Sequence, residues 1–107
     1  MTPKTRRRDP IAGSAWFSGH RIAVSNDVLV LEGFAYFPLE DVADGVLRRS
    51  RFKSLCYWKG IASYFHVLGG DEVARNSAWT YRHPSPIARR IKNRVAFWHD
   101  IEVRLDR

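Results

Sequence analysis

The ten-residue stretch Cys56–Phe65 constrains the fold of this chain more than any other feature. It contains a thiol, a lysine and four aromatic rings, and from Gly60 onward its side chains alternate between the two faces expected of a β-strand. A second aromatic block, Ala78-Trp79-Thr80-Tyr81, follows it. Aromatic residues favour strands, and at this density they must fill the core or line a pocket. The chain is therefore predicted to be mainly β.

The length of 107 residues suits a single domain with one hydrophobic core. One cysteine excludes an internal disulfide and a cysteine-rich zinc site. No apolar run approaches the roughly 18 residues that suggest a membrane span, so no membrane association is expected. The basic N-terminus has no apolar segment behind it, which predicts no secretory signal and a cytoplasmic location.

The net charge of +7 favours contact with polyanions, but its distribution is uneven. Four of the cations lie in the N-terminal segment, and without them the balance is 7 − 4 = +3. We therefore expect weak, nonspecific nucleic-acid binding through a basic tail. A dedicated RNA or DNA interaction module is an alternative, which a flat basic face would favour: Arg48, Arg49, Arg51, Arg89 and Arg90.

Turn-forming residues divide the chain into short elements. Residues 1–13 are predicted to be a disordered basic tail, and residues 14–107 a single domain. In the first half the pattern predicts strands at 16–24 and 28–32, with a turn at 25–27 between them. An irregular segment is predicted at 33–54, with one helical turn at 38–42.

The second half has clearer periodicity. Strands are predicted at 60–68 and 73–81, and Ser85-Pro86 predicts the start of a short helix over 85–92, with Ile87 and Ile91 on one face. The last two runs, 95–98 and 101–106, flank His99-Asp100 and predict an antiparallel hairpin.

Four blocks of this sequence, in order and spacing, resemble the domain of unknown function family 427. The resemblance covers roughly residues 16–105, although Tyr57 stands where that family usually has proline and Phe65 where it has tyrosine. The matching blocks are Tyr36-Phe37-Pro38-Leu39-Glu40-Asp41-Val42, Cys56-Tyr57-Trp58-Lys59-Gly60-Ile61-Ala62-Ser63-Tyr64, Ala78-Trp79-Thr80-Tyr81 and Ile91-Lys92-Asn93-Arg94-Val95-Ala96-Phe97.

The resemblance implies a β-tent fold, in which two antiparallel sheets meet at an angle. That fold is similar to methionine-R-sulfoxide reductases and to the ligand-binding domain of cereblon. Many relatives hold it with four zinc-binding cysteines, so packing must replace the metal in this chain. The family also carries a nucleotidyltransferase label, but Gly13-Ser14 has no Asp-x-Asp partner downstream to supply the carboxylates of two-metal chemistry.

The leading functional hypothesis is a pocket for a small anionic or aromatic molecule. Aromatic walls with hydroxyl and indole groups, together with a lysine, suit such a ligand. The alternative for these rings is ordinary core packing. The predicted ligand-binding residues are Tyr36, Lys59, Tyr64, Trp79 and Tyr81.

The alternative hypothesis is a small enzyme that uses Cys56 or Lys59, with Glu32 or Glu40 as its acid or base. A thiolate beside a lysine would be an activated nucleophile. The competing interpretations are a buried thiol, a surface lysine packed on Trp58, and carboxylates that pair with an arginine (Arg21 for Glu32) or stabilise a helix terminus.

No cofactor is predicted. The histidines lack the spacing of metal ligands, so no metal site is expected either. They are His20, His66, His83 and His99.

Overall fold

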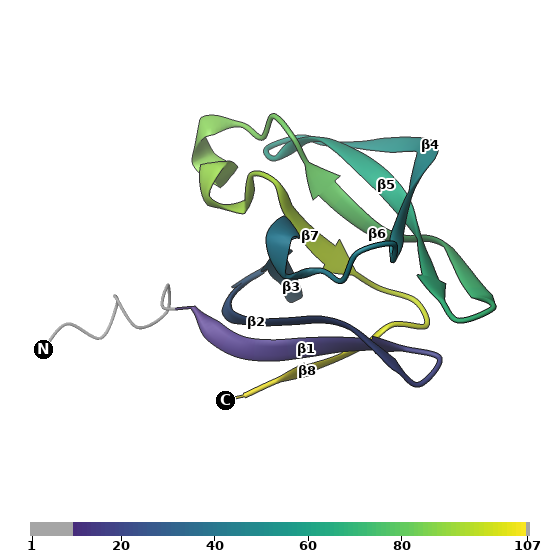
Figure 1. Cartoon of the computed structure of the whole chain (residues 1–107). Coiled ribbons are helices and arrows are strands. Elements are labelled where there is room, and N and C mark those ends of the chain that lie inside the picture. Colours follow the sequence, from purple (N-terminus) through teal and green to yellow (C-terminus); the bar gives the residue numbers. More distant parts are fainter. Residues whose placement is uncertain (1–9, 107) are drawn as a thin grey trace, which may run out of the picture.

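Eight β-strands and two short 3-10 helices form residues 10–106, the part of the chain that this computed structural model describes (Figure 1). No helix among these residues is long and apolar enough to cross a membrane. In chain order the elements are β1 (Ile11–Phe17), β2 (His20–Leu31), β3 (Phe34–Pro38), η1 (Leu39–Asp41), β4 (Leu47–Cys56), β5 (Gly60–Gly69), β6 (Glu72–Tyr81), η2 (Pro86–Ile91), β7 (Arg94–Phe97) and β8 (Glu102–Leu105).

The strands form one antiparallel sheet in the order β4-β5-β6-β7-β3-β2-β1-β8. This confirms the mainly-β prediction. Strand β2 is long enough to serve two partners, because its first part pairs with β1 and its last three residues pair with β3. Hydrogen bonding is therefore continuous between the two predicted sheets. Figure 1 shows the β1, β2 and β8 part lying across from the β4–β6 part, at an angle to it.

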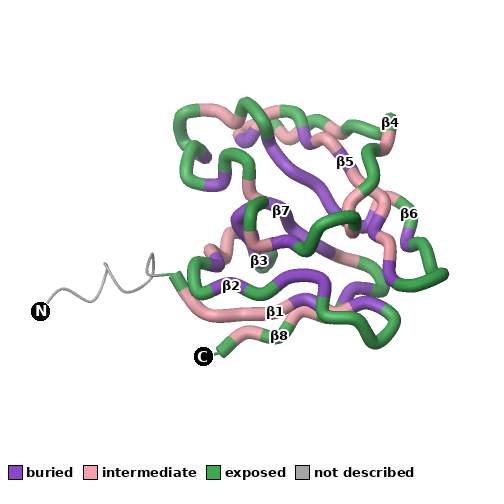
Figure 2. Tube along the Cα trace, in the orientation of Figure 1, coloured by how far each residue is buried: buried purple, intermediate pink, exposed green. Residues whose placement is uncertain are grey.

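A cluster of buried apolar side chains, from alanine to phenylalanine in size, forms the main core. Figure 2 shows buried backbone running along β2, β3, β6 and β7. The Phe37 and Phe97 rings meet edge to face there, with their centroids 5.7 Å apart. A second buried cluster consists of Tyr36, Ala62, Tyr64, Trp79, Tyr81, Ala88, Ile91 and Ala96.

The N-terminal boundary differs from the prediction. Strand β1 begins at Ile11, so the last three residues of the predicted tail, 11–13, are strand. Residues 1–9 of that tail lie outside the described part. The predicted turn at 25–27 is also wrong. Asn26 and Asp27 form a bulge within β2, where Ile11 pairs with Val28 but Gly13 pairs with Ser25.

The prediction of an irregular segment at 33–54 is wrong as well, apart from the helical turn at 38–42, which appears as η1. The segment contains β3 and most of β4. Strand β4 lies at the edge of the sheet and none of its residues is fully buried. A strand without a buried face shows no alternation of apolar and polar residues, so its sequence carries little signal.

The C-terminal hairpin prediction is wrong, because β7 pairs with β3 and β6 whereas β8 pairs with β1. The predicted helix is the 3-10 segment η2, with a non-helical residue at Ala88. This kink separates the two isoleucines that were predicted to share a face, since Ile87 is 74% exposed and Ile91 is fully buried.

Candidate functional site

Lys59 is buried at the start of β5 and is paired with a carboxylate from a distant turn. Its ammonium donates to Oε1 of Glu32, which lies between β2 and β3. The Trp58 indole N–H donates to the other carboxylate oxygen at 3.1 Å. The lysine side chain is 9% exposed and the glutamate side chain 46% exposed, so the pair spans the boundary between the interior and the solvent.

Two aromatic rings surround the lysine ammonium. Its nitrogen lies 5.5 Å from the ring centroid of Trp58 and 5.7 Å from that of Tyr81. Both distances are within the range of a cation–π interaction. The charge is thus held by one carboxylate and two ring faces.

The Lys59–Glu32 pair favours the charged form of both groups. The hydrogen bond from Lys59 is the main cause that lowers the pKa of Glu32, with help from the Coulomb attraction and from the Trp58 N–H. Desolvation alone would lower the pKa of Lys59, but the hydrogen bond to Glu32 and nearby negative groups outweigh it, so this pKa is raised.

A row of paired residues, three of them aromatic, crosses four strands near this pair. Tyr64 pairs with Trp79, Trp79 pairs with Ala96, and Ala96 pairs with Tyr36. Because paired residues share a face of the sheet, the three rings lie side by side. Trp79 and Tyr36 meet edge to face with centroids 6.4 Å apart, and the Trp79 N–H donates to the Tyr36 hydroxyl at 3.3 Å.

The hydroxyl groups of Tyr36, Tyr64 and Tyr81 differ in their surroundings. Tyr64 shares a hydrogen bond of 3.0 Å with Ser54, and Tyr36 accepts from Trp79. Tyr81 is 5% exposed, and no fully buried side-chain nitrogen or oxygen among the described residues lacks a hydrogen-bond partner. Burial raises the pKa of both Tyr36 and Tyr81, so both remain neutral donors at physiological pH.

Cys56 lies at the end of β4, opposite Gly60. It is partly buried against the same aromatic cluster. Of the predicted catalytic candidates, Cys56, Lys59 and Glu32 are therefore brought to one place.

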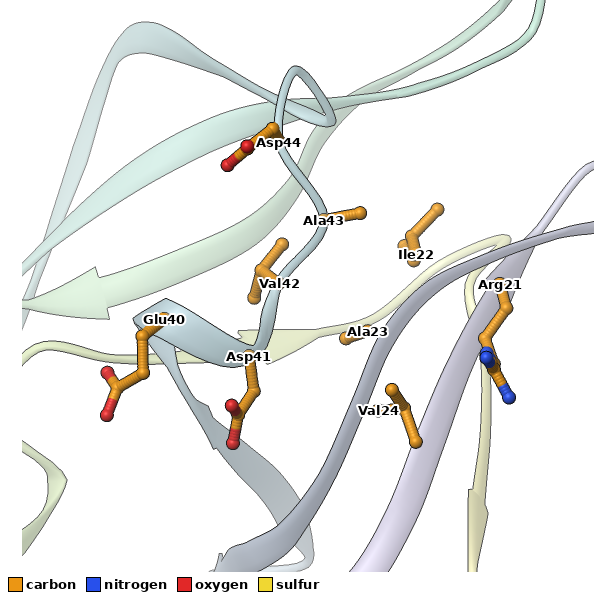
Figure 3. A pocket seen from close by; sticks show the side chains of 9 residues that line it. All are labelled: Arg21, Ile22, Ala23, Val24, Glu40, Asp41, Val42, Ala43 and Asp44. Carbon is orange, nitrogen blue, oxygen red and sulfur yellow. The ribbon is translucent and has the colours of Figure 1, made fainter.

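Glu40 is not part of this group. It belongs to η1 and lines a separate hollow of about 460 Å³ between β2 and the segment that follows η1 (Figure 3). Arg21 lines the same hollow, so the predicted pairing of Glu32 with Arg21 is wrong. The other residues of the hollow are Ile22, Ala23, Val24, Asp41, Val42, Ala43 and Asp44.

The five predicted ligand-binding residues lie together, but as packed side chains. Each is less than 10% exposed, and none lines this hollow or the three others described by the structure. Sequence reasoning missed Phe34 and Trp98, whose rings flank Trp79 at 4.9 and 5.3 Å. It also missed the contact of Trp58 with Glu32, for which the adjacency of Trp58 and Lys59 was the only sequence signal.

The turn that carries Lys59 is fixed against the segment before η2. The Ser85 backbone N–H donates to the Lys59 carbonyl at 3.0 Å, and the Ser85 hydroxyl donates to the Trp58 carbonyl. Gly60 has a φ of +115° and leaves little room for a side chain, since a Cβ would lie 3.2 Å from the His83 carbonyl oxygen. This close approach sets the position of the lysine backbone.

Gly60→Ala is therefore expected to destabilise the protein by roughly 1–3 kcal/mol, the usual cost of a side chain in a strained conformation. The control is Gly45→Ala, at a φ of +78° with no atom within 4 Å of the added methyl. Urea unfolding measures both. An equal loss in the two variants would show that the contact with the 83–85 segment contributes nothing.

Among the described residues, no three His, Cys, Asp or Glu side chains gather as a metal ion would require. No curated protein matches the chain. One protein family matches it over residues 12–107, with the description Domain of unknown function (DUF427) and a name that carries a nucleotidyltransferase label. Because the match spans nearly the whole chain, this protein belongs to the family described as Domain of unknown function (DUF427).

Proposed function

We propose that this protein binds a small anionic or aromatic molecule at the Lys59 site, in the cytoplasm, where its single cysteine stays reduced. One observation carries the proposal: a buried ammonium whose carboxylate partner sits on an exposed turn. Desolvating a charge is costly, and a core position could hold a methionine at lower cost. A ligand that needs the charge would account for a lysine at this position.

Binding would exchange one carboxylate for another. An incoming anion takes the place of Glu32 on the Lys59 ammonium, and the faces of Trp58 and Tyr81 contact an aromatic ring of the ligand. The Tyr81 hydroxyl, which stays protonated because burial raises its pKa, supplies a further hydrogen-bond donor.

The turn that bears Glu32 suits this exchange. Glu32 and Gly33 have φ values of 55° and 82°, which places both in the left-handed region of a tight two-residue turn. Glu32 is the exposed end of the pair, so its carboxylate regains water when it leaves the lysine. When the pair breaks, the desolvation cost for the Glu32 carboxylate is therefore far smaller than that for the buried Lys59 ammonium.

For the enzyme alternative, the candidate catalytic residues lie close together, but Lys59 is not activated as a nucleophile. Cys56, Lys59 and Glu32 lie in one group, yet a nucleophilic lysine requires a lowered pKa and the pKa of Lys59 is raised. The charged form of Lys59 suits a binding role. The flat basic face of the nucleic-acid alternative is also not favoured, because its arginines lie near opposite ends of β5. Arg48 pairs with His66 toward the C-terminal end of that strand. Arg89 belongs to η2, which follows the segment packed against Gly60 at the N-terminal end.

Benzoate, an aromatic anion, and benzamide, its neutral counterpart, test the proposal. In a titration followed by two-dimensional amide NMR, benzoate is expected to shift the signals of Lys59, Gly60 and Tyr81 saturably, and more strongly than benzamide does. Lys59→Met should abolish the benzoate response. The matched control is Lys53→Met, an exposed lysine that hydrogen-bonds Ser63. No response in the wild type, or an equal loss in both variants, would contradict the proposal.

Glu32→Gln provides the complementary test. If Glu32 competes with the ligand for Lys59, its removal raises the fraction of binding-competent protein. The apparent affinity for benzoate should then rise about tenfold, the factor expected if roughly a tenth of the wild type is free of the pair. An unchanged or weaker affinity would show that Glu32 contacts the ligand or takes no part in binding.

A further inference from the structure

A basic hollow lies at the opposite end of β5 from the Lys59 site. Its volume is about 370 Å³, and it is lined by side chains from β4, β5 and β6: Arg48, Arg49, His66, Val73 and Arg75. A volume of this size is within the usual range of small-molecule sites. Three exposed arginines and a histidine thus line one concave surface.

Two bulges bring these side chains together. Arg48 pairs directly with His66, but β4 then has extra residues between Arg49 and Lys53. Opposite His66 the register of β6 shifts too, because Phe65 pairs with Ala78 whereas Val67 pairs with Ala74. Bulges bend a strand and redirect its side chains, and they gather at functional surfaces.

The imidazole of His66 is held in place by the second bulge. Asn76 has a φ of +52°, and its backbone N–H donates to Nδ1 of His66 at 3.1 Å. A nitrogen that accepts a hydrogen bond carries no proton, so the neutral ring has its N–H at Nε2. This leaves Nε2 as a donor for a ligand.

The arginines of the hollow have no carboxylate partner within 4 Å among residues 10–106. The ion pairs found there are Lys59–Glu32, Arg94–Asp27 and Arg104–Glu102. Like charges that share a hollow without counter-charges repel one another and destabilise the folded state. A bound anion would remove this cost.

We propose that the hollow formed by Arg48, Arg49, His66 and Arg75 binds the phosphate groups of a small phosphorylated molecule. Guanidinium groups form paired hydrogen bonds that match phosphate oxygens, and each arginine remains charged at any physiological pH. The concave shape favours a discrete ligand over an extended strand. A nucleic-acid backbone presents the same phosphate chemistry and is the competing source.

Isothermal titration calorimetry with inorganic pyrophosphate, at about 0.15 M salt to screen exposed charges, tests the proposal. Wild type is expected to bind, and Arg48→Gln/Arg75→Gln to lose at least about tenfold in affinity, as expected when two charge-assisted contacts are removed. The matched control is Arg82→Gln/Arg90→Gln, which removes the same charge from exposed positions outside the hollow and should bind like the wild type. His66→Gln, which removes the Nε2 donor, should also weaken binding.

Three results would overturn the proposal. Equal losses in the two double variants would show that only the net charge acts. No pyrophosphate binding by the wild type would show that the hollow is not a phosphate site. A second titration uses a single-stranded oligothymidylate of ten nucleotides. If that strand binds more tightly than pyrophosphate and loses its affinity in Arg48→Gln/Arg75→Gln, the hollow serves a nucleic-acid backbone and the small-ligand proposal is wrong.

Discussion

Trp79→Ala is expected to lower the free energy of unfolding by about 3–5 kcal/mol, the usual cost of deleting a large buried aromatic side chain. Trp79 is 6% exposed, and its ring lies within 6.4 Å, centroid to centroid, of four others: Phe34, Tyr36, Tyr64 and Trp98. The variant removes the centre of this cluster. Urea unfolding at constant protein concentration measures the loss.

Trp79→Phe keeps a ring but removes the indole N–H that donates to Tyr36. It should cost roughly 1–3 kcal/mol through the cavity and the lost hydrogen bond. Trp16→Ala is the control, because Trp16 is only partly buried on β1 and should cost less than Trp79→Ala. If both Trp79 variants stay within about 0.5 kcal/mol of wild type, the range of surface changes, the ring has an open face instead of a packed one.

The two members of the Lys59–Glu32 pair should respond differently to substitution. Lys59→Met is expected to leave stability nearly unchanged or raise it, because it removes a buried charge and leaves a half-exposed glutamate that water can solvate. Glu32→Gln leaves the buried ammonium without its carboxylate and should cost roughly 1–3 kcal/mol. The double variant should recover most of that loss.

The pH dependence of the unfolding free energy at acidic pH tests the same difference between Lys59 and Glu32. Because the pKa of Glu32 is lowered in the folded state, its stabilising contribution is present above its ordinary value of 4.5. That contribution disappears as the pH falls through the lowered value. The difference between wild type and Glu32→Gln should shrink accordingly in melts below about pH 4, as linkage requires. A greater loss for Lys59→Met than for Glu32→Gln would contradict this account of the pair.

Local patterns predicted two neighbouring strands of the sheet well. The strands at 60–68 and 73–81 are confirmed as β5 and β6. Buried residues alternate along much of β5, the last five residues of β6 are all buried, and Gly70-Asp71 forms the turn between the two strands. The edge strand β4 and the pairing of β8 with β1 could not be read from the sequence. An edge strand lacks a buried face, and the choice of a distant partner depends on the whole sheet.

The same distinction holds for the candidate site. Tyr64, Trp79 and Tyr81 lie on two neighbouring strands and Lys59 immediately precedes the first of them, so their proximity followed from local alternation. The partner of Lys59 did not, because Glu32 precedes it by 27 residues and meets it only across the folded sheet. The basic hollow depends on two bulges, which shift the register at Arg49 and His66 in a way that alternation alone cannot indicate.

Native mass spectrometry of protein purified gently from its own host tests the central claim most directly. The wild type and Lys53→Met are expected to carry a small-molecule adduct of the same mass, and Lys59→Met is expected to lack it. Urea melts of the same preparations confirm that Lys59→Met is folded. An adduct that persists in folded Lys59→Met, or no adduct on any of the three proteins, would contradict a ligand site at Lys59.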